Sequence, residues 1–157
     1  MKHINSIKII FKSLCLFFVV GQLQAQECNG NIIETTPTSR FTQNNAFIAD
    51  NTTRLFWMRC AVGQVWSGAG QFPECTGTAT LYNWKQALDE SIIFNAGAGW
   101  RLPNIKELSS IVERACKDPA INETIFPNTE NAFWTSSPVI TGSGSGAFAL
   151  VIGFNSG

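Results

Sequence analysis

The sequence contains little histidine and little charge, and both shortages exclude common kinds of function. Its single histidine, His3, lies in the N-terminal stretch described below as a removable leader. Without it the chain has no imidazole for a catalytic triad, a zinc site or a pH switch near neutrality. Charged residues make up only 14% of the chain, and no basic cluster follows the leader. Nucleic acid is therefore not expected as a partner.

The first 25 residues have the features of a secretory signal peptide. Lys2, Lys8 and Lys12 occur without any acidic residue, an apolar run follows at residues 14–20, and a small residue stands at Ala25. The alternative, a retained membrane anchor, is less favoured because the run is well short of the roughly 20 apolar residues of a membrane span.

Cleavage after this leader would leave residues 26–157, a length suited to one domain with its own core. The three basic residues of the leader would be lost while all 11 acidic residues stay, so the net charge would be −3. We expect a product that is secreted, periplasmic or on the cell surface, with no membrane span.

Four cysteines remain after the leader: Cys28, Cys60, Cys75 and Cys116. An even number in an exported protein favours two disulfides. We predict Cys60 with Cys75, because the segment between them is rich in glycine and can fold back, and therefore Cys28 with Cys116. The alternative, a four-thiolate metal site, has no closely spaced Cys-x-x-Cys pair to support it.

The N-terminal half is predicted to be mostly extended. Residues 32–40 are expected to form an arm, residues 41–48 and 55–58 the two strands of a hairpin with a turn at Asp50 and Asn51, and residues 60–78 a loop. A helix then begins after Asn83, the expected cap, with Trp84, Ala87, Leu88 and Ile92 on its apolar side.

A second helix has the clearest start signal of the chain. Asn104 and Glu107 have the spacing of a capping box, and Pro103 precedes them. Apolar residues at helical spacing predict that the helix reaches residue 115 and buries one stripe, formed by Leu108, Ile111, Val112 and Ala115.

The C-terminal part is predicted to contain two strands. Residues 120–126 are expected to be irregular, with Ile121, Ile125 and Phe126 as buried anchors. Strands are expected at 133–136 and 147–154, joined through a Gly/Ser hairpin loop at 142–146. The final residues 155–157 have turn composition with no strand after them, which suggests a domain cut short at its C-terminus.

Short motifs in a fixed order resemble one family, the C-terminal domain of the Legionella collagen-like adhesin, a widespread bacterial domain. The matching segments are residues 36–41 (TPTSRF), 57–60 (WMRC), 75–79 (CTGTA), 84–88 (WKQAL), 100–108 (WRLPNIKEL), 118–122 (DPAIN), 126–129 (FPNT) and 133–138 (FWTSSP). Within them, the residues that we expect to be structural are Trp84, Ala87, Trp100, Arg101, Leu102, Pro103, Asn104, Glu107 and Trp134.

The resemblance implies an α+β domain with a C-type-lectin-like fold, in which two helices flank a curled antiparallel sheet. It also implies adhesion, since the best-studied member binds sulfated glycans at cell surfaces. The sequence departs from the family in two respects. The family's final strand, with its short Val-Arg motif, is missing, and a net charge of −3 does not suit a polyanion.

Tryptophan is the best candidate for ligand contact, because an indole face can stack on the apolar face of a sugar ring. Trp57, Trp84, Trp100 and Trp134 fall in helix or strand patterns and are expected in the core. Trp66 lies in the Cys60–Cys75 loop with no pattern to bury it, so we single it out as the candidate ligand contact.

The polar residues suggest no catalytic, metal or cofactor site. Glu107 is explained as a cap, Glu113 and Asp89 as solvated helix residues, and Asp118 as a turn residue. Arg101 is expected to pack its stem and bond a carbonyl rather than bind an anion. Ser136 and Ser137 would need a nearby base to act as nucleophiles, and the sequence has no triplet typical of calcium-dependent lectins.

These observations favour a non-catalytic binding module that recognises a glycan or a protein surface. Two alternatives stay open. The first is a structural module that assembles into homo-oligomers through an exposed sheet edge. The second is an enzyme related to the formylglycine-generating fold, which would need reactive cysteines that are here assigned to disulfides.

Overall fold

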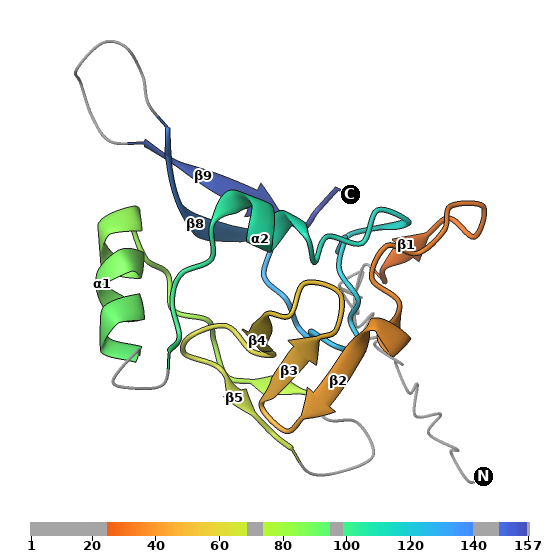
Figure 1. Ribbon diagram of the computed structural model, residues 1–157, viewed down its shortest axis with the longest axis horizontal. Helices are drawn as coiled ribbons and strands as arrows, with labels where there is room; N and C mark the ends of the chain where they lie inside the picture. The colour runs from red at the N-terminus through yellow and green to blue at the C-terminus, as the bar shows by residue number, and fades with distance from the viewer. Residues whose placement is uncertain (1–24, 69–73, 95–98, 140–147, 157) are drawn as a thin grey trace, which may run out of the picture.

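The computed structural model describes residues 25–68, 74–94, 99–139 and 148–156, a chain of short strands, two helices and long irregular segments (Figure 1). The elements are β1 (Glu27–Cys28), the 3-10 helix η1 (Thr38–Arg40), β2 (Phe41–Asn44), β3 (Phe47–Asp50), β4 (Phe56–Met58), β5 (Val65–Trp66), β6 (Cys75–Thr76), α1 (Trp84–Phe94), α2 (Ile105–Ser109), β7 (Cys116–Lys117), β8 (Ala132–Val139) and β9 (Phe148–Gly153). The predicted α+β class and its two helices are confirmed. The predicted leader, except Ala25, and the predicted loop at 142–146 lie outside the described residues.

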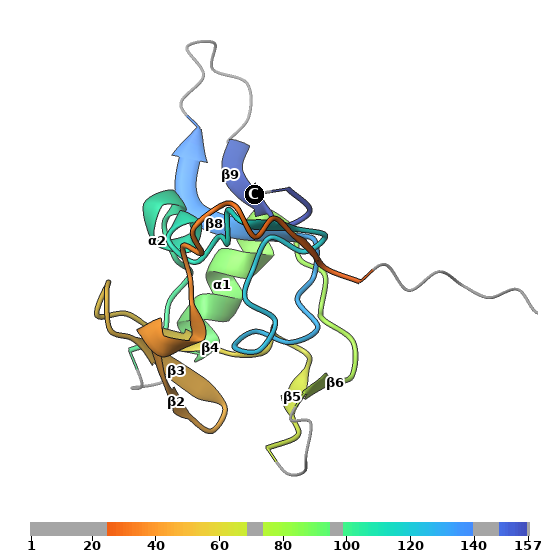
Figure 2. The same cartoon turned by 90° about the vertical axis from the view of Figure 1, so that its right-hand side faces the viewer.

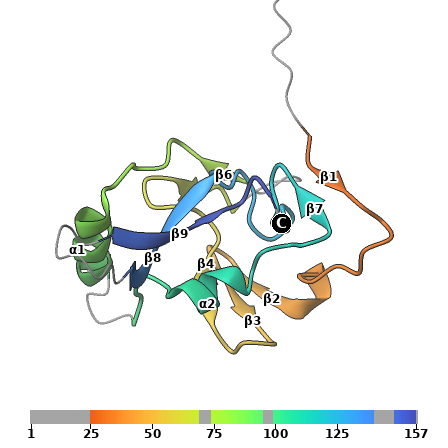
Figure 3. The ribbon, with the colours of Figure 1, turned by 90° about the horizontal axis from the view of Figure 1, so that it is seen from above.

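The described strands are divided among four small antiparallel sheets, where the sequence had suggested one curled sheet. The sheets are β1 with β7, β2–β3–β4, β5 with β6, and β8 with β9. Figures 1 and 3 place α1 at one end of the molecule and the β1–β7 pair at the other. Figure 2 shows the β8–β9 and β5–β6 hairpins projecting in opposite directions.

One core cluster joins the β2–β3–β4 and β8–β9 sheets to α2 and the irregular segments. Its buried members are Phe41, Ile48, Leu108, Ile111, Val112, Ala120, Ile121, Ile125, Phe126 and Phe154, with Trp57, Phe133 and Ile152 packed against them. The predicted anchors of the irregular segment 120–126 are confirmed, since all three belong to the cluster. The core therefore depends as much on irregular segments as on helices and strands.

The predicted strand at 41–48 is wrong, because it is two strands with a tight turn between them. Asn45 has φ 54°, in the left-handed region that asparagine tolerates better than most residues. The predicted turn at Asp50 is confirmed. The buried Asp50 carboxylate accepts a hydrogen bond from the Thr53 hydroxyl (2.7 Å) and pairs with Arg40.

The segment predicted as a loop at 60–78 contains strands β5 and β6. Val65 pairs with Thr76 and Trp66 with Cys75. The Cys60–Cys75 disulfide, with Cα atoms 5.4 Å apart, holds the two arms together at one end. Sequence periodicity missed this hairpin because two residues per strand are too few to show alternation.

Helix α1 begins as predicted, with a reciprocal cap. The Gln86 N–H donates to Asn83 Oδ1 and the Asn83 N–H donates to Gln86 Oε1, both at 2.9 Å. The prediction that Ile92 lies on the buried side of the helix is wrong, since 71% of this residue is exposed. The helix contacts β8 through its first turns, so its C-terminal turn extends past the core. In the described part of the chain, neither helix has the length and hydrophobicity to cross a bilayer.

Helix α2 is shorter than predicted, five residues in place of about twelve. The capping box is confirmed, with the Glu107 N–H donating to Asn104 Oδ1 (3.0 Å) and the Asn104 N–H to Glu107 Oε2 (2.8 Å). Beyond Ser109 the chain continues in tight turns, since the Ile111 and Val112 N–H groups donate to carbonyls three residues back. The predicted apolar stripe is nevertheless buried.

Glu113, in the turns that follow the helix, was predicted to lie on a solvated helix face. That prediction is wrong, because Glu113 is 3% exposed. Its carboxylate accepts hydrogen bonds from the N–H and hydroxyl of Thr35 (3.0 and 3.3 Å), from the N–H and hydroxyl of Thr36 (2.7 and 2.8 Å) and from the Ala115 N–H (2.9 Å). A straight helix would carry this side chain away from the arm.

The N-terminal arm, taken from here on as residues 26–40, is thus part of the fold. The Cys28–Cys116 disulfide is present as predicted, and it lies within the β1–β7 pair, where Cys28 is opposite Cys116. Upstream, the Gln26 side-chain amide donates to the Pro119 and Ile121 carbonyls, both at 2.6 Å. These contacts attach the arm to residues 116–121, which are about 90 positions later in the sequence.

The C-terminal strands are confirmed, with β8 longer than predicted. The sequence pattern places Phe148, Leu150 and Ile152 on one face of β9. Of these, Ile152 packs against the core, while Phe148 and Leu150 are exposed. Phe154, just past the strand, is buried, and its carbonyl accepts from the Ala120 N–H (2.5 Å). The end of the described chain is therefore fixed to the core, whereas the beginning of β9 is not.

Candidate functional site

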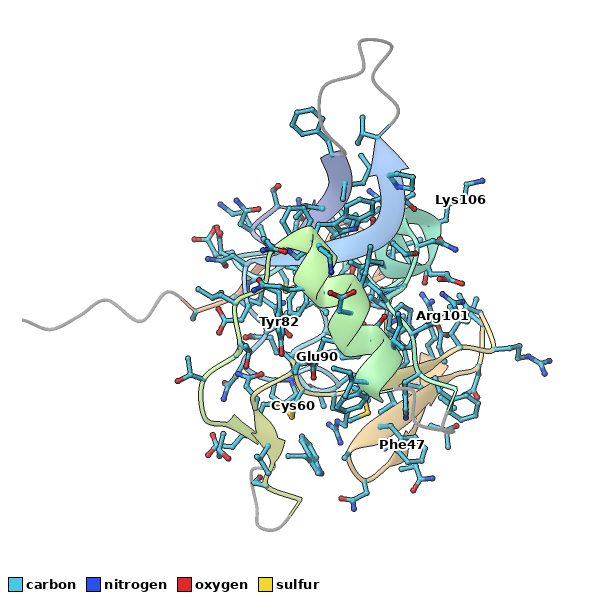
Figure 4. The ribbon with its side chains drawn as sticks, turned by 90° about the vertical axis from the view of Figure 1, so that its left-hand side faces the viewer. Phe47, Cys60, Tyr82, Glu90, Arg101 and Lys106 are labelled. Atoms are coloured by element: carbon cyan, nitrogen blue, oxygen red, sulfur yellow. A yellow bond between two sulfur atoms is a disulfide. The ribbon has the colours of Figure 1, made fainter. Side chains whose placement is uncertain are left out.

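A cavity in the described part of the chain has a volume of about 990 Å³. It lies between the β3–β4 hairpin, α1, the segment before α2 and β8. Figure 4 views this side, with Phe47, Cys60, Tyr82, Glu90 and Arg101 labelled around α1. All five belong to its wall. Ligand pockets are commonly about 300–1,000 Å³ and mostly apolar with a few polar groups, and this cavity fits that description.

Aromatic side chains make up much of the wall. They are Phe47, Phe56, Trp57, Trp66, Tyr82, Phe94, Trp100, Phe126, Phe133, Trp134 and Phe154. Four of the five tryptophans are included. Trp84 is the exception, because it anchors the first turn of α1 to β8. The four tryptophans that the sequence assigned to the core are only half-buried, and three of them line the cavity.

The indole N–H groups differ in what they bond. Trp84 Nε1 donates to the Thr135 carbonyl (2.8 Å) and Trp134 Nε1 to the Tyr82 carbonyl (2.7 Å). Trp57 Nε1 is buried and has no hydrogen-bond partner among the described residues. A buried donor without a partner costs roughly 1–3 kcal/mol. Trp57 lines the cavity and carries an unpaired donor that is covered in this structure, and sequence patterns gave no signal of this.

Arg59, two residues after Trp57, is a buried cation whose hydrogen-bond partners are neutral. Its Nε donates to the Ile125 carbonyl and its Nη2 to the Thr124 carbonyl, both at 2.9 Å, and its Nη1 donates to Gln43 Oε1 (3.1 Å). Burial lowers the pKa of the guanidinium, although arginine stays charged in proteins. This arginine fixes the 124–125 segment beneath the cavity.

Trp66, the predicted ligand contact, lies against Arg59. The guanidinium carbon is 3.8 Å from the centroid of the Trp66 ring, a cation–π contact. The ring is half-buried in the cavity wall, and Arg59 takes up one of its faces. That Trp66 contacts a ligand stays a prediction. Because Arg59 covers one face of the indole, a ligand would have to use the other face.

The segment before α2 forms another wall of the cavity. Trp100 packs edge to face on Phe47, with ring centroids 6.1 Å apart. The sequence predicted that Arg101 bonds a backbone carbonyl, but its main partner is a carboxylate. It makes a bidentate pair with Glu107 (2.7 and 2.5 Å), which raises the pKa of Arg101 and lowers that of Glu107.

The same segment is joined to β8 through Pro103, Ile105 and two serines. The Ser136 N–H donates to the Pro103 carbonyl (2.8 Å), and the Ile105 N–H donates to Ser137 Oγ (3.0 Å). Leu102 and Pro103 line the cavity. Ser137 therefore has a structural contact, because its hydroxyl oxygen accepts a hydrogen bond from the N-terminus of α2.

The remaining acidic candidates lie apart from one another. Asp89 forms an exposed pair with Lys85 (2.5 Å), in agreement with a solvated helix face, and Asp118 precedes Pro119 in a bend. Among the described residues, no group of three or more histidine, cysteine, aspartate or glutamate side chains is placed to hold a metal ion. The four cysteines are joined in two disulfides, which excludes the four-thiolate alternative.

Comparisons with known proteins agree with the sequence motifs. No curated protein and no solved structure matches the chain significantly. The family model of the Lcl C-terminal domain matches residues 46–157, which include the cavity walls, both helices and the strands from β3 to β9. The chain belongs to the Lcl C-terminal domain family, an adhesin-associated family.

Proposed function

We propose that this chain is a secreted or surface-exposed, non-catalytic binding module with a C-type-lectin-like architecture, which recognises a glycan in an adhesion or envelope setting. The observation that carries the proposal is the aromatic cavity with the unpaired Trp57 N–H in its wall. Membership of an adhesin-associated family supports the setting. Two disulfides support an exported protein, since disulfides persist in oxidising compartments.

A sugar suits the chemistry of this cavity. Aromatic faces pack against the C–H face of a pyranose, and hydroxyl oxygens accept hydrogen bonds from a donor such as Trp57 Nε1. The chain beyond the leader carries a net charge of −3, which disfavours a polyanion on electrostatic grounds. We therefore favour neutral glycans over sulfated ones, with a protein surface as the alternative ligand.

Structural roles of the reactive residues support a non-catalytic function. Ser137 bonds the N-terminus of α2, Glu107 bonds Arg101 and Asn104, and Glu113 bonds the N-terminal arm. The cysteines that an enzyme of the formylglycine-generating type would need are in disulfides. Each of these serine, glutamate and cysteine side chains therefore already has a structural partner.

The test is a glycan-array screen of the folded mature chain on neutral and sulfated glycans, followed by titration of the best binder. Trp57→Phe keeps an aromatic side chain but replaces the indole by a smaller phenyl ring without the N–H, so affinity should fall by about tenfold, the value of one hydrogen bond of about 1.4 kcal/mol. Trp66→Ala should also weaken binding.

The matched control is Trp84→Phe, the same chemical change at the tryptophan outside the cavity wall. It breaks the bond to the Thr135 carbonyl, so it should lower stability and leave the affinity of the folded protein unchanged. If no glycan binds, or if Trp84→Phe weakens binding as much as Trp57→Phe, the cavity is not the glycan site.

A further inference from the structure

Three aromatic side chains in the cavity wall form one cluster. Phe47 packs edge to face on Phe56, with ring centroids 6.3 Å apart, and on Trp100, with ring centroids 6.1 Å apart. All three line the cavity. Phe56 is 61% exposed and the other two rings are half-buried. This cluster, called the platform from here on, therefore presents aromatic surface to solvent.

The platform stands on the face of the β3–β4 hairpin that points away from the core. Ile48 is opposite Trp57 in this hairpin, and Ile48 is fully buried in the core cluster. Because side chains alternate along a strand, Phe47 and Phe56 share the other face. The cavity borders both faces, since β4 is the last strand of its sheet in the described structure. The platform is therefore separate from the Trp57 N–H.

A charged pair lies next to the platform. Arg101 directly follows Trp100 and makes its bidentate contact with Glu107, whose carboxylate is also held by the Asn104 N–H. Figure 4 shows Phe47 and Arg101 on the same side of α1. The Arg101 side chain is 55% exposed, although its position is fixed by the pair. Polar groups are thus held in place beside the rings.

The Arg101–Glu107 pair retains hydrogen-bonding capacity. A guanidinium has five N–H groups. Among the described residues, those of Arg101 contact only Glu107 and, at 3.4 Å, the Leu102 carbonyl. Donors therefore remain for a ligand oxygen. Because the two side chains already fix each other, a ligand would pay little of the entropy of ordering them.

An aromatic surface beside a fixed polar pair matches the two sides of a hexopyranose. The C–H face of the sugar packs on the rings, and the hydroxyl groups at its edge donate to the carboxylate and accept from the guanidinium. The charges of Arg101 and Glu107 compensate each other, so this surface does not select a charged sugar. An aliphatic protein surface would cover the rings but desolvate the pair without replacing its bonds to water, which is costly.

We propose that the platform and the Arg101–Glu107 pair form the contact surface for one uncharged hexopyranose ring of a glycan. The sugar stacks on the rings of Phe56 and Trp100, and Arg101 bonds its hydroxyl oxygens. This assignment rests on the proposed glycan-binding function and names the residues that perform it.

The experiment follows the indole N–H signals of the mature chain by NMR. All five tryptophans lie beyond the leader, so the folded chain gives five such signals, and Trp→Phe variants assign them. The probes are the methyl glycosides of glucose, galactose, mannose and N-acetylglucosamine. At least one of them should shift the Trp100 signal in a saturable way, and its C–H protons should move upfield over the rings.

Variants test the rings and the pair separately, with the methyl glycoside that shifts Trp100 most. Phe56→Ala removes an exposed ring and should lower affinity about fivefold, the value of one aromatic contact. Phe148→Ala is the matched control, because Phe148 is 57% exposed on β9 and does not line the cavity, and it should leave affinity unchanged. Arg101→Lys keeps the charge but loses the planar bidentate geometry, so affinity should again fall about fivefold.

The outcomes distinguish this assignment from the proposed function. If an array glycan binds but no methyl glycoside shifts the Trp100 signal, or if Phe56→Ala binds as well as Phe148→Ala, the platform is not the contact surface and glycan binding still stands. Loss of affinity in Phe56→Ala but not in Arg101→Lys removes the pair from the site and overturns the assignment as stated. If neither the array glycans nor the methyl glycosides bind, the proposed function and this assignment fail together.

Discussion

The two ends of the molecule are stabilised in different ways. At the β1–β7 end, a buried carboxylate, a disulfide and the Gln26 side chain fix the N-terminal arm through polar and covalent contacts. At the α1 end, aromatic packing surrounds a cavity, Ile92 and Ile93 are exposed, and one indole N–H is unpaired. The first end can be altered only at a cost in stability, whereas the second holds an aromatic cavity and a buried donor without a partner.

The disulfides should show the largest difference between the ends. In the chain-entropy model, removing Cys28–Cys116, which spans 88 residues, costs about 4.5 kcal/mol, and removing Cys60–Cys75, which spans 15, costs about 3 kcal/mol. Denaturant unfolding of the two Cys→Ser pairs measures both values. Non-reducing peptide mapping of the wild type should give these two linkages, and a Cys28–Cys60 or Cys28–Cys75 peptide would contradict them.

Glu113→Ala should cost about 3 kcal/mol of unfolding free energy. It leaves buried N–H and hydroxyl groups of the arm without their acceptor. The measurement is again denaturant unfolding, with Asp89→Ala, an exposed carboxylate on α1, as the control. A cost within about 0.5 kcal/mol would mean that the arm is not fixed by this carboxylate.

The same carboxylate should make stability depend on pH. Burial raises the pKa of Glu113, but the N–H groups of Ala115, Thr35 and Thr36 and the Thr36 hydroxyl lower it by more, so the folded pKa lies below the ordinary 4.5. Its stabilising contribution is then complete above about pH 4.5 and is lost as pH falls through the folded pKa. Stability of Glu113→Gln should fall less steeply than wild type over that interval. Identical slopes would refute this assignment.

Asn104→Ala should cost about 1 kcal/mol, because it removes one half of the capping box of α2. Asn44→Ala, at an exposed asparagine of β2, is the matched control and should change stability little. Melting temperatures of the two variants within error of each other would count against the cap.

Trp57→Phe should have the smallest net effect on stability, within about 0.5 kcal/mol of wild type, because removal of a buried donor without a partner offsets the packing lost with the smaller ring. Trp134→Phe, which breaks the bond to the Tyr82 carbonyl, should cost about 1 kcal/mol more. A large loss of stability in Trp57→Phe would show that the N–H has a partner.

Sequence patterns predicted the features that depend on neighbouring residues. The caps at Asn83 and Asn104, the two helix starts and the turn at Asp50 follow from residues within four positions of one another. The disulfide pairing followed from parity and loop composition. Except for the Cys28–Cys116 bond, which joins residues 88 apart, the physical cause lies in a short stretch of chain, where sequence spacing is informative.

The features that sequence missed depend on distant partners. Glu113 has the spacing of a solvated helix residue, and only the arm, 77 residues away, explains its burial. The unpaired Trp57 N–H and the Arg59 contacts to the Thr124 and Ile125 carbonyls likewise arise from tertiary packing. The cavity itself has no signature in the sequence, because the same aromatic residues would also fill a closed core.

The contacts of the N-terminal arm also fix the order in which the chain folds. Gln26 and Ile121 are 95 residues apart, and Thr35 and Glu113 are 78 apart, whereas the β2–β3–β4 meander and the Cys60–Cys75 pair join residues close in sequence. Closing a long loop costs more chain entropy than closing a short one, and non-local contacts slow folding. We therefore expect the arm to be among the last segments to dock, with its threonines exposed until Glu113 reaches them.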